Sequence, residues 1–130
     1  MEKNFDAWNE DKKKLDRMRS DFDFHEREIW WCAIGINVGS EQLSFSADFS
    51  RPILVVRRLS PNVFLGIPFT TKTDDKLPFR VRVVVEGVSN DVLIGQIRAF
   101  DRKRLYRKIA VLAEADFDIM KNHLVEMIEG

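Results

Sequence analysis

The spacing of apolar residues divides the chain into a helical start, a strand-rich middle and a helical end. In residues 1–24, apolar residues recur every three, four or seven positions beside the charged run EDKKKLDR, which is typical of an amphipathic helix. The same spacing returns from about residue 114. Its expected inner stripe consists of Phe117, Met120, Leu124, Met127 and Ile128. The sequence therefore predicts an N-terminal helical extension, residues 1–24, and a main domain, residues 25–130, that closes with a helix.

The segments between these helices have the pattern of short strands separated by turns. Strands are expected over residues 27–35, 53–59, 63–67, 79–87, 92–98 and 105–112. In the fourth segment, Phe79 and three valines alternate with Arg80 and Arg82, which predicts a half-exposed strand with both arginines facing water. Because strands and helices do not alternate, the pattern argues against a doubly wound sheet. The pattern favours a mainly β protein, a small closed or half-open barrel.

The charged residues are unevenly distributed along the chain, although the formal net charge is zero. Residues 51–108 hold 13 Lys/Arg against 5 Asp/Glu, whereas residues 1–50 hold 7 against 11 and residues 109–130 hold 1 against 5. A basic middle between acidic ends suggests an anionic partner, with nucleic acid the leading candidate. The alternative is a solvated surface on which charges happen to cluster.

Length and composition limit the remaining classes. The chain of 130 residues suits one domain. A single cysteine excludes a disulfide framework and fits a cytoplasmic protein. No apolar run approaches the roughly 20 residues of a membrane helix, and the start lacks the apolar stretch of a signal peptide. We therefore expect a cytoplasmic protein without a membrane partner.

Familiar site chemistries are mostly missing. The phosphate-binding P-loop and the dinucleotide glycine fingerprint are absent. The two histidines, His25 and His123, have nothing in the sequence that brings them together. Asp74 and Asp75 lie among lysines and are expected to be solvated, and Cys32 is expected to be packed in a strand. No metal site and no cofactor are therefore predicted.

The remaining candidates for a functional site are polar residues at the ends of the predicted strands. In SRPILVV, Arg51 and Pro52 stand directly before four apolar residues, and a charge beside a core must be paired, solvated or used. Similar polar stretches are NVGSEQ after the first strand, IPFTT after the third, and GQIRAFDRKRL further on. Each alone is compatible with ordinary turn and rim residues.

Taken together and in order, REIWWCAIGINVGSEQ, RPILVV, IPFTT and QIRAFDRKRL resemble the PemK/MazF family of toxin endoribonucleases, over roughly residues 25–125. The resemblance implies a dimeric SH3-like barrel that cleaves single-stranded RNA at short sequences without metal. The ribose 2′-hydroxyl attacks the adjacent phosphate, leaving a 2′,3′-cyclic phosphate and a 5′-hydroxyl end. It also implies a cognate antitoxin whose flexible acidic tail occupies the RNA groove.

The same resemblance assigns residues. Arg51 is expected to face the scissile phosphate as an electrostatic clamp, since a planar guanidinium holds two phosphate oxygens. Thr70 matches the second catalytic position, and its hydroxyl is expected to donate to that phosphate. Glu41 is the candidate general base, because it is the only carboxylate inside a matching motif on the substrate side. The expected RNA contacts are Gly39, Ser40, Gln42, Lys72, Gln96 and Arg98.

Three questions stay open. One branch of the family carries an arginine and an aspartate just before the glutamine of the Gln-Ile-Arg motif, whereas Leu93, Ile94 and Gly95 precede Gln96 here; this favours the branch that uses arginine and threonine. The related CcdB toxins inhibit DNA gyrase on the same scaffold without cutting RNA, so a non-catalytic inhibitor is the competing hypothesis. The acidic extension, residues 1–24, either packs on the barrel or restrains its basic groove.

Overall fold

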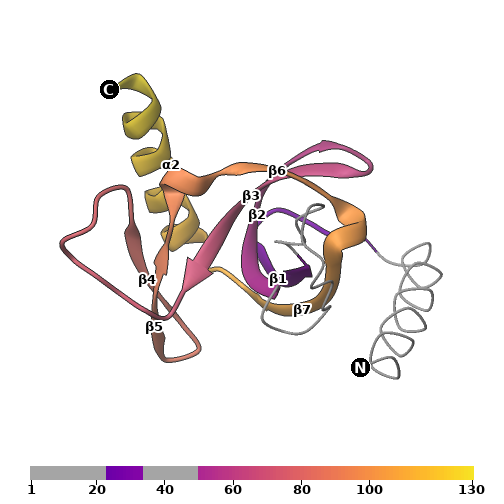
Figure 1. Ribbon diagram of the computed structural model, residues 1–130, viewed down its shortest axis with the longest axis horizontal. Coiled ribbons are helices and arrows are strands. Elements are labelled where there is room, and N and C mark those ends of the chain that lie inside the picture. The colour runs from indigo at the N-terminus through magenta and orange to yellow at the C-terminus, as the bar shows by residue number, and fades with distance from the viewer. Residues whose placement is uncertain (1–22, 34–49) are drawn as a thin grey trace, which may run out of the picture.

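The computed structural model describes residues 23–33 and 50–130, and these are mainly antiparallel strands (Figure 1). The strands are β1 (Glu28–Ala33), β2 (Ser50–Ser60), β3 (Val63–Thr70), β4 (Val81–Val85), β5 (Val88–Val92), β6 (Arg98–Asp101) and β7 (Leu105–Val111). Short 3-10 turns η2 (Ile94–Gln96) and η3 (Arg102–Arg104) flank β6, and helix α2 (Glu114–Glu129) ends the chain. The predicted mainly β fold with a C-terminal helix is confirmed. Residues 1–22 of the predicted N-terminal extension lie outside the described residues.

Strand β3 takes part in three ladders. Its first half pairs with β6 and its last two residues pair with β5, while β2 runs along its other side. Beyond β2 follow β1 and β7, and among the described strands β4 pairs with β5 alone. Figure 1 shows β2, β3 and β7 curling around a common centre, with α2 outside this curl. Within residues 23–33 and 50–130, β6 and β7 do not pair, so this part of the predicted barrel is half-open.

Two hydrophobic cores lie on opposite faces of the curled sheet. The inner core consists of Phe24, Trp30, Cys32, Ile53, Val55, Phe64, Phe100 and Leu105. The outer core lies beneath α2 and consists of Ile29, Leu54, Val56, Ile67, Phe69, Val81, Val83, Val92, Ile94, Leu112, Phe117, Met120 and Leu124. Alternate residues of β2 enter different cores, which explains the unbroken apolar run of that strand. The prediction that Cys32 is packed is confirmed.

One predicted strand was misplaced. The sequence suggested a turn at GVSND and a strand over residues 92–98, but Val88–Val92 is the strand and Ile94–Gln96 form a 3-10 turn. The chain reverses instead at Glu86 and Gly87, both with positive φ, as a tight hairpin requires. Polar residues suggested the turn, whereas pairing with β4 and β3 makes the segment a strand.

Two apolar residues were also misassigned. Phe79 was expected to face the core but lies before β4 with a φ of 59° and is 57% exposed. Ile128 was expected in the inner stripe of α2 but is 70% exposed, whereas Phe117, Met120 and Leu124 are buried as predicted. No helix within residues 23–33 and 50–130 combines the length and the apolarity needed to cross a membrane.

Gly66 allows three side chains of the inner core to meet over β3. A Cβ atom at this position would lie 2.6 Å from Ile53 Cγ2 and 2.9 Å from ring carbons of Phe64 and Phe100. Such overpacking typically costs a few kcal/mol, so we expect Gly66→Ala to lower the free energy of unfolding by about 2 kcal/mol. Urea denaturation would measure this. The control is Gly95→Ala, whose Cβ would have the exposed Phe79 as its nearest neighbour, at 3.3 Å; equal stability of the two variants would contradict the expectation.

Candidate active site

Arg51 and Thr70 lie just beyond the same end of the β2–β3 ladder. The last pair of that ladder joins Ile53 to Pro68. Arg51 precedes Ile53 by two residues and Thr70 follows Pro68 by two residues. Because side chains alternate along a strand, both point to the face that carries the inner core. The structure therefore brings the two predicted catalytic residues to one rim of the half-open barrel.

The backbone at Arg51 is held by a neighbouring strand. Arg51 is in register with Cys32 of β1, and Pro52 is in register with Trp31. Arg51 is exposed although its cross-strand neighbour Cys32 is fully buried. The guanidinium is thus carried by ordered strand structure while its head reaches water, which suits a group that must meet an anionic ligand.

The hydroxyl of Thr70 accepts a hydrogen bond from the loop that follows β3. The backbone N–H of Lys72 donates to Thr70 Oγ1 at 3.0 Å, closing a small turn directly after β3. A hydroxyl that accepts one hydrogen bond still has its own hydrogen to donate. Thr70 is half-buried, and this hydrogen bond lies at the exposed end of β3.

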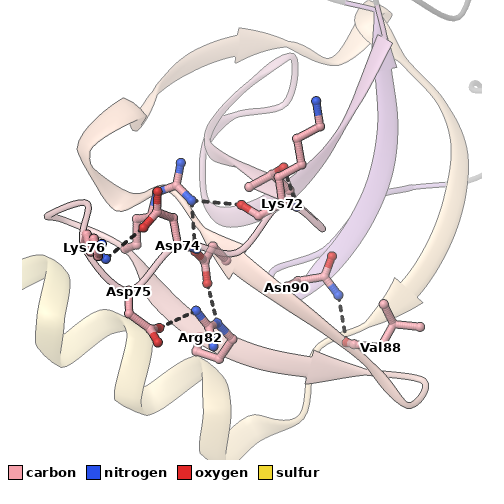
Figure 2. A network of polar contacts seen from close by, with 10 residues as sticks. Lys72, Asp74, Asp75, Lys76, Arg82, Val88 and Asn90 are labelled. Carbon is pink, nitrogen blue, oxygen red and sulfur yellow. Dashed lines mark hydrogen bonds and ion pairs between the residues drawn. The ribbon is translucent and has the colours of Figure 1, made fainter.

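A buried carboxylate lies beside Thr70. Asp91 of β5 is in register with Thr70 on one side and with Arg82 on the other, and it is only 1% exposed. It accepts from Arg82 Nε at 2.6 Å, from Arg80 Nη1 at 2.9 Å and from the Asp74 backbone N–H at 2.9 Å. We call these four residues, Asp74, Arg80, Arg82 and Asp91, the Asp91 network (Figure 2).

The Asp91 network extends to both sides of the loop that follows β3. Arg80 Nη1 also donates to the backbone carbonyl of Lys72 at 3.0 Å. Arg82 Nη2 lies 2.6 Å from a carboxylate oxygen of the exposed Asp75. Figure 2 shows Arg82 directed toward Asp75 across this loop. The two arginines therefore tie the loop to the β4–β5 hairpin at separate points.

Burial and hydrogen bonding oppose each other at Asp91. Burial raises the pKa of this carboxyl, but donors from Arg82, the Asp74 amide and Arg80 outweigh burial and lower the pKa below its ordinary value. The hydrogen bond to Asp91 also raises the pKa of Arg82. Asp91 is accordingly a fixed anion at neutral pH. Arg82 is exposed on the half-buried strand β4, as predicted, whereas Arg80 lies just before β4 and is half-buried. The positive charges of both are paired with this carboxylate, which the sequence pattern did not predict.

The other predicted contacts are more dispersed. Lys72 is exposed in the loop after β3, and Gln96 is exposed in η2. Arg98 pairs with Gly66 across β6 and β3, about 13 Å along β3 from Thr70, with its guanidinium 4.5 Å from the centre of the Phe100 ring. The remaining predicted site residues, Gly39, Ser40, Glu41 and Gln42, lie outside the described residues, so their roles stay predictions.

The residues set aside from the sequence have ordinary partners. His25 lies 3.2 Å from Glu28, and His123 lies 3.7 Å from Glu126. Within the described residues, no three His, Cys, Asp or Glu side chains gather as metal ligands.

Sequence reasoning missed the Asp91 network. Two arginines at alternate positions of one predicted strand suggest a carboxylate on a neighbouring strand, and Asp91 stands immediately before the apolar residues Val92, Leu93 and Ile94. That combination was a usable signal. It was obscured because Ser89, Asn90 and Asp91 have the composition of a turn.

Comparison with known proteins agrees with this architecture. Residues 25–128 match the model of a family described as PemK-like, MazF-like toxin of type II toxin-antitoxin system. A comparison with curated protein sequences finds no match.

Solved structures with the same fold include MazF from Deinococcus radiodurans, 23% identical with a TM-score of 0.62 over 85% of this chain and 100% of that one. A MazE-MazF structure from the same organism is 21% identical, with a TM-score of 0.60 over 83% and 97% of the two chains. An endoribonuclease in complex with its cognate antitoxin, from a mycobacterial species, is 14% identical, with a TM-score of 0.61 over 80% and 93%.

Proposed function

This chain belongs to the PemK-like, MazF-like family of toxins of type II toxin-antitoxin systems, and from that premise we propose that it is a metal-independent endoribonuclease selective for short single-stranded RNA sequences. The observation that carries this proposal is the placement of Arg51 and Thr70 at one rim of the sheet, two residues beyond a shared ladder pair. Family membership supports the class of activity, and the rim geometry supports its site.

In the proposed reaction, the 2′-oxygen of a ribose forms a bond to the adjacent phosphorus while the bond from phosphorus to the 5′-oxygen breaks. The 5′-oxygen leaves with the bonding pair and takes up a proton from water. Arg51 holds two phosphate oxygens and stabilises the charge that gathers there. Thr70 donates its hydroxyl hydrogen to the same phosphate. Glu41 is the proposed general base that takes the 2′-hydroxyl proton.

We extend the proposal to the assembly and its partners. The active form is a homodimer of SH3-like barrels in the cytoplasm, and a cognate antitoxin inhibits it by laying a flexible acidic segment along the basic middle of the chain. The excess of 13 Lys/Arg over 5 Asp/Glu in residues 51–108 supports an anionic occupant. The expected RNA contacts are Gly39, Ser40, Gln42, Lys72, Gln96 and Arg98.

The decisive experiment incubates the purified chain with a long unstructured RNA in excess EDTA. We expect cuts at one short sequence with 5′-hydroxyl ends, and loss of those cuts in Arg51→Ala and Thr70→Ala. Intact RNA from a folded wild-type protein would contradict the nuclease and favour the non-catalytic inhibitor of a protein target such as DNA gyrase.

Binding should weaken with salt, because lysine and arginine release counterions from the phosphates they bind. For a 2′-deoxy-blocked oligonucleotide, we expect the log–log slope of affinity against salt to change by about 0.7 for each phosphate that the protein no longer binds. Lys72→Ala should therefore reduce the slope by about 0.7. Lys121→Ala, on α2 beside Phe117, is the matched control and should leave the slope unchanged. Identical slopes for both variants would show that Lys72 does not bind an RNA phosphate.

A further inference from the structure

We propose that Arg80 and Asp91 are positioning residues that fix the hydroxyl of Thr70 for phosphate contact, an inference that rests on the proposed nuclease function. Neither residue touches the site of reaction in this proposal. They act through the short backbone segment that follows Thr70.

The first step concerns the Lys72 peptide groups. Lys72 donates its N–H to Thr70 Oγ1 at 3.0 Å, and its carbonyl accepts from Arg80 Nη1 at 3.0 Å. One residue is therefore bound on both sides, by the catalytic hydroxyl and by a guanidinium of the hairpin side. Because the loop after β3 is exposed, these bonds fix a segment that burial alone would leave unconstrained.

The second step concerns the anchor. Arg80 Nη1 reaches Asp91 Oδ2 at 2.9 Å, and the Asp74 backbone N–H reaches the same oxygen at 2.9 Å. Asp91 is buried at a strand position paired with Thr70 itself. The carboxylate thus ties the loop back to the strand beside the hydroxyl that the loop orients.

The consequence is a defined orientation of the Thr70 hydroxyl hydrogen. Because the Lys72 N–H occupies a lone pair of Thr70 Oγ1, the hydroxyl hydrogen is turned away from Lys72 and is free to donate elsewhere. Without the Arg80 contact to the Lys72 carbonyl, the peptide group after Lys72 loses this hold, and the backbone of Lys72 can rotate and release the hydroxyl from the Lys72 N–H. A small loss of orientation at a reacting group has a large effect on rate.

Arg82 provides the matched control. It binds the other oxygen of Asp91, Oδ1, and the side chain of Asp75. It therefore shares the ion pair with Asp91, but neither of these two bonds goes to the backbone of residues 70–74. Removing Arg82 weakens the same carboxylate site while leaving the contact to the Lys72 carbonyl in place.

The experiment compares Arg80→Gln with Arg82→Gln in steady-state cleavage of a short RNA. We expect Arg80→Gln to lower kcat by about 30-fold with KM within about twofold, and Arg82→Gln to change kcat by less than about threefold. In a Thr70→Val background, Arg80→Gln should add less than about a twofold loss, because residues that act as a unit are not additive. Amide hydrogen exchange at Lys72 should accelerate in Arg80→Gln and not in Arg82→Gln.

The possible failures are distinguishable. Wild-type protein that leaves RNA intact overturns the nuclease proposal and the catalytic part of this inference together. Wild-type cleavage with equal kcat values for the two glutamine variants, or unchanged exchange at Lys72 in Arg80→Gln, overturns the positioning role alone. A full additional loss in the Thr70→Val background also overturns it, because the arginine would then act independently of the hydroxyl.

Discussion

Replacing Arg51 by alanine is expected to reduce the rate of RNA cleavage about a thousandfold. Alanine removes the group proposed to hold the phosphate oxygens as charge gathers on them. Since Arg51 is exposed and lies outside both hydrophobic cores, the variant should keep the fold and melt within about 2 °C of the wild type. Single-turnover cleavage of a short RNA, with saturating protein, would measure the chemical step directly.

Two further variants sharpen this test. Arg51→Lys retains the positive charge but cannot form the two-pronged contact, so its rate should fall between those of the wild type and Arg51→Ala. Arg57→Ala removes another exposed arginine of the same strand β2 and should cleave within about twofold of the wild type. An equal loss in Arg57→Ala would show that net positive charge on β2, rather than Arg51 itself, drives cleavage.

The largest effect on stability is expected at Asp91. Asp91→Ala leaves Arg80, only 19% exposed at its side chain, and Arg82 without the carboxylate that both contact. Breaking a buried ion pair by removing one partner typically costs about 3 kcal/mol of unfolding free energy. The control is Asp75→Ala, whose side chain is 88% exposed while pairing with the same Arg82; it should cost less than about 1 kcal/mol. Urea denaturation that gave equal values would contradict the distinction.

Lowering the pH should remove the contribution that the Asp91 carboxylate makes to the free energy of unfolding. The folded-state pKa of Asp91 lies below the ordinary value of 3.8, burial notwithstanding, because of its hydrogen bonds to Arg82, the Asp74 amide and Arg80. Its stabilisation is therefore complete well above pH 3.8 and is lost as the pH falls through the folded-state pKa. Glu28, whose pKa is also lowered from its ordinary 4.5 against the effect of burial, adds a parallel loss. We expect stability to fall less steeply with acid in Asp91→Ala than in the wild type.

Local patterns predicted the elements that depend on local spacing. The closing helix begins at Glu114 as its apolar period indicates, and the apolar run of β2 is a strand. The sequence of β5 misled because Ser89, Asn90 and Asp91 favour turns in isolation. Two arginines on the β4 side neutralise that carboxylate, so a contact across strands overrides the local preference.

The candidate site likewise combines residues that could be identified from the sequence with contacts that could not. Arg51 and Thr70 could be chosen from motifs at strand ends, but their common edge follows only from the pairing of Ile53 with Pro68. The turn between Thr70 and Lys72, and its fixation by Arg80, depend on hydrogen bonds to a loop whose conformation no periodic pattern reveals. Long-range pairing is the physical information that a single sequence lacks.

Strand β3 pairs with β2 on one side and with β5 and β6 on the other. These pairings determine where the chain tolerates insertions. One residue inserted between Gly66 and Thr70 would reverse the alternation and turn the Thr70 side chain toward the outer core. The same insertion would shift the strand against β5, since Thr70 is paired with Asp91. The hairpin tip at Glu86 and Gly87 carries neither constraint, because both residues are exposed and lie at the end of a two-stranded ladder. A reporter peptide or an affinity tag therefore belongs at that tip and not in β3.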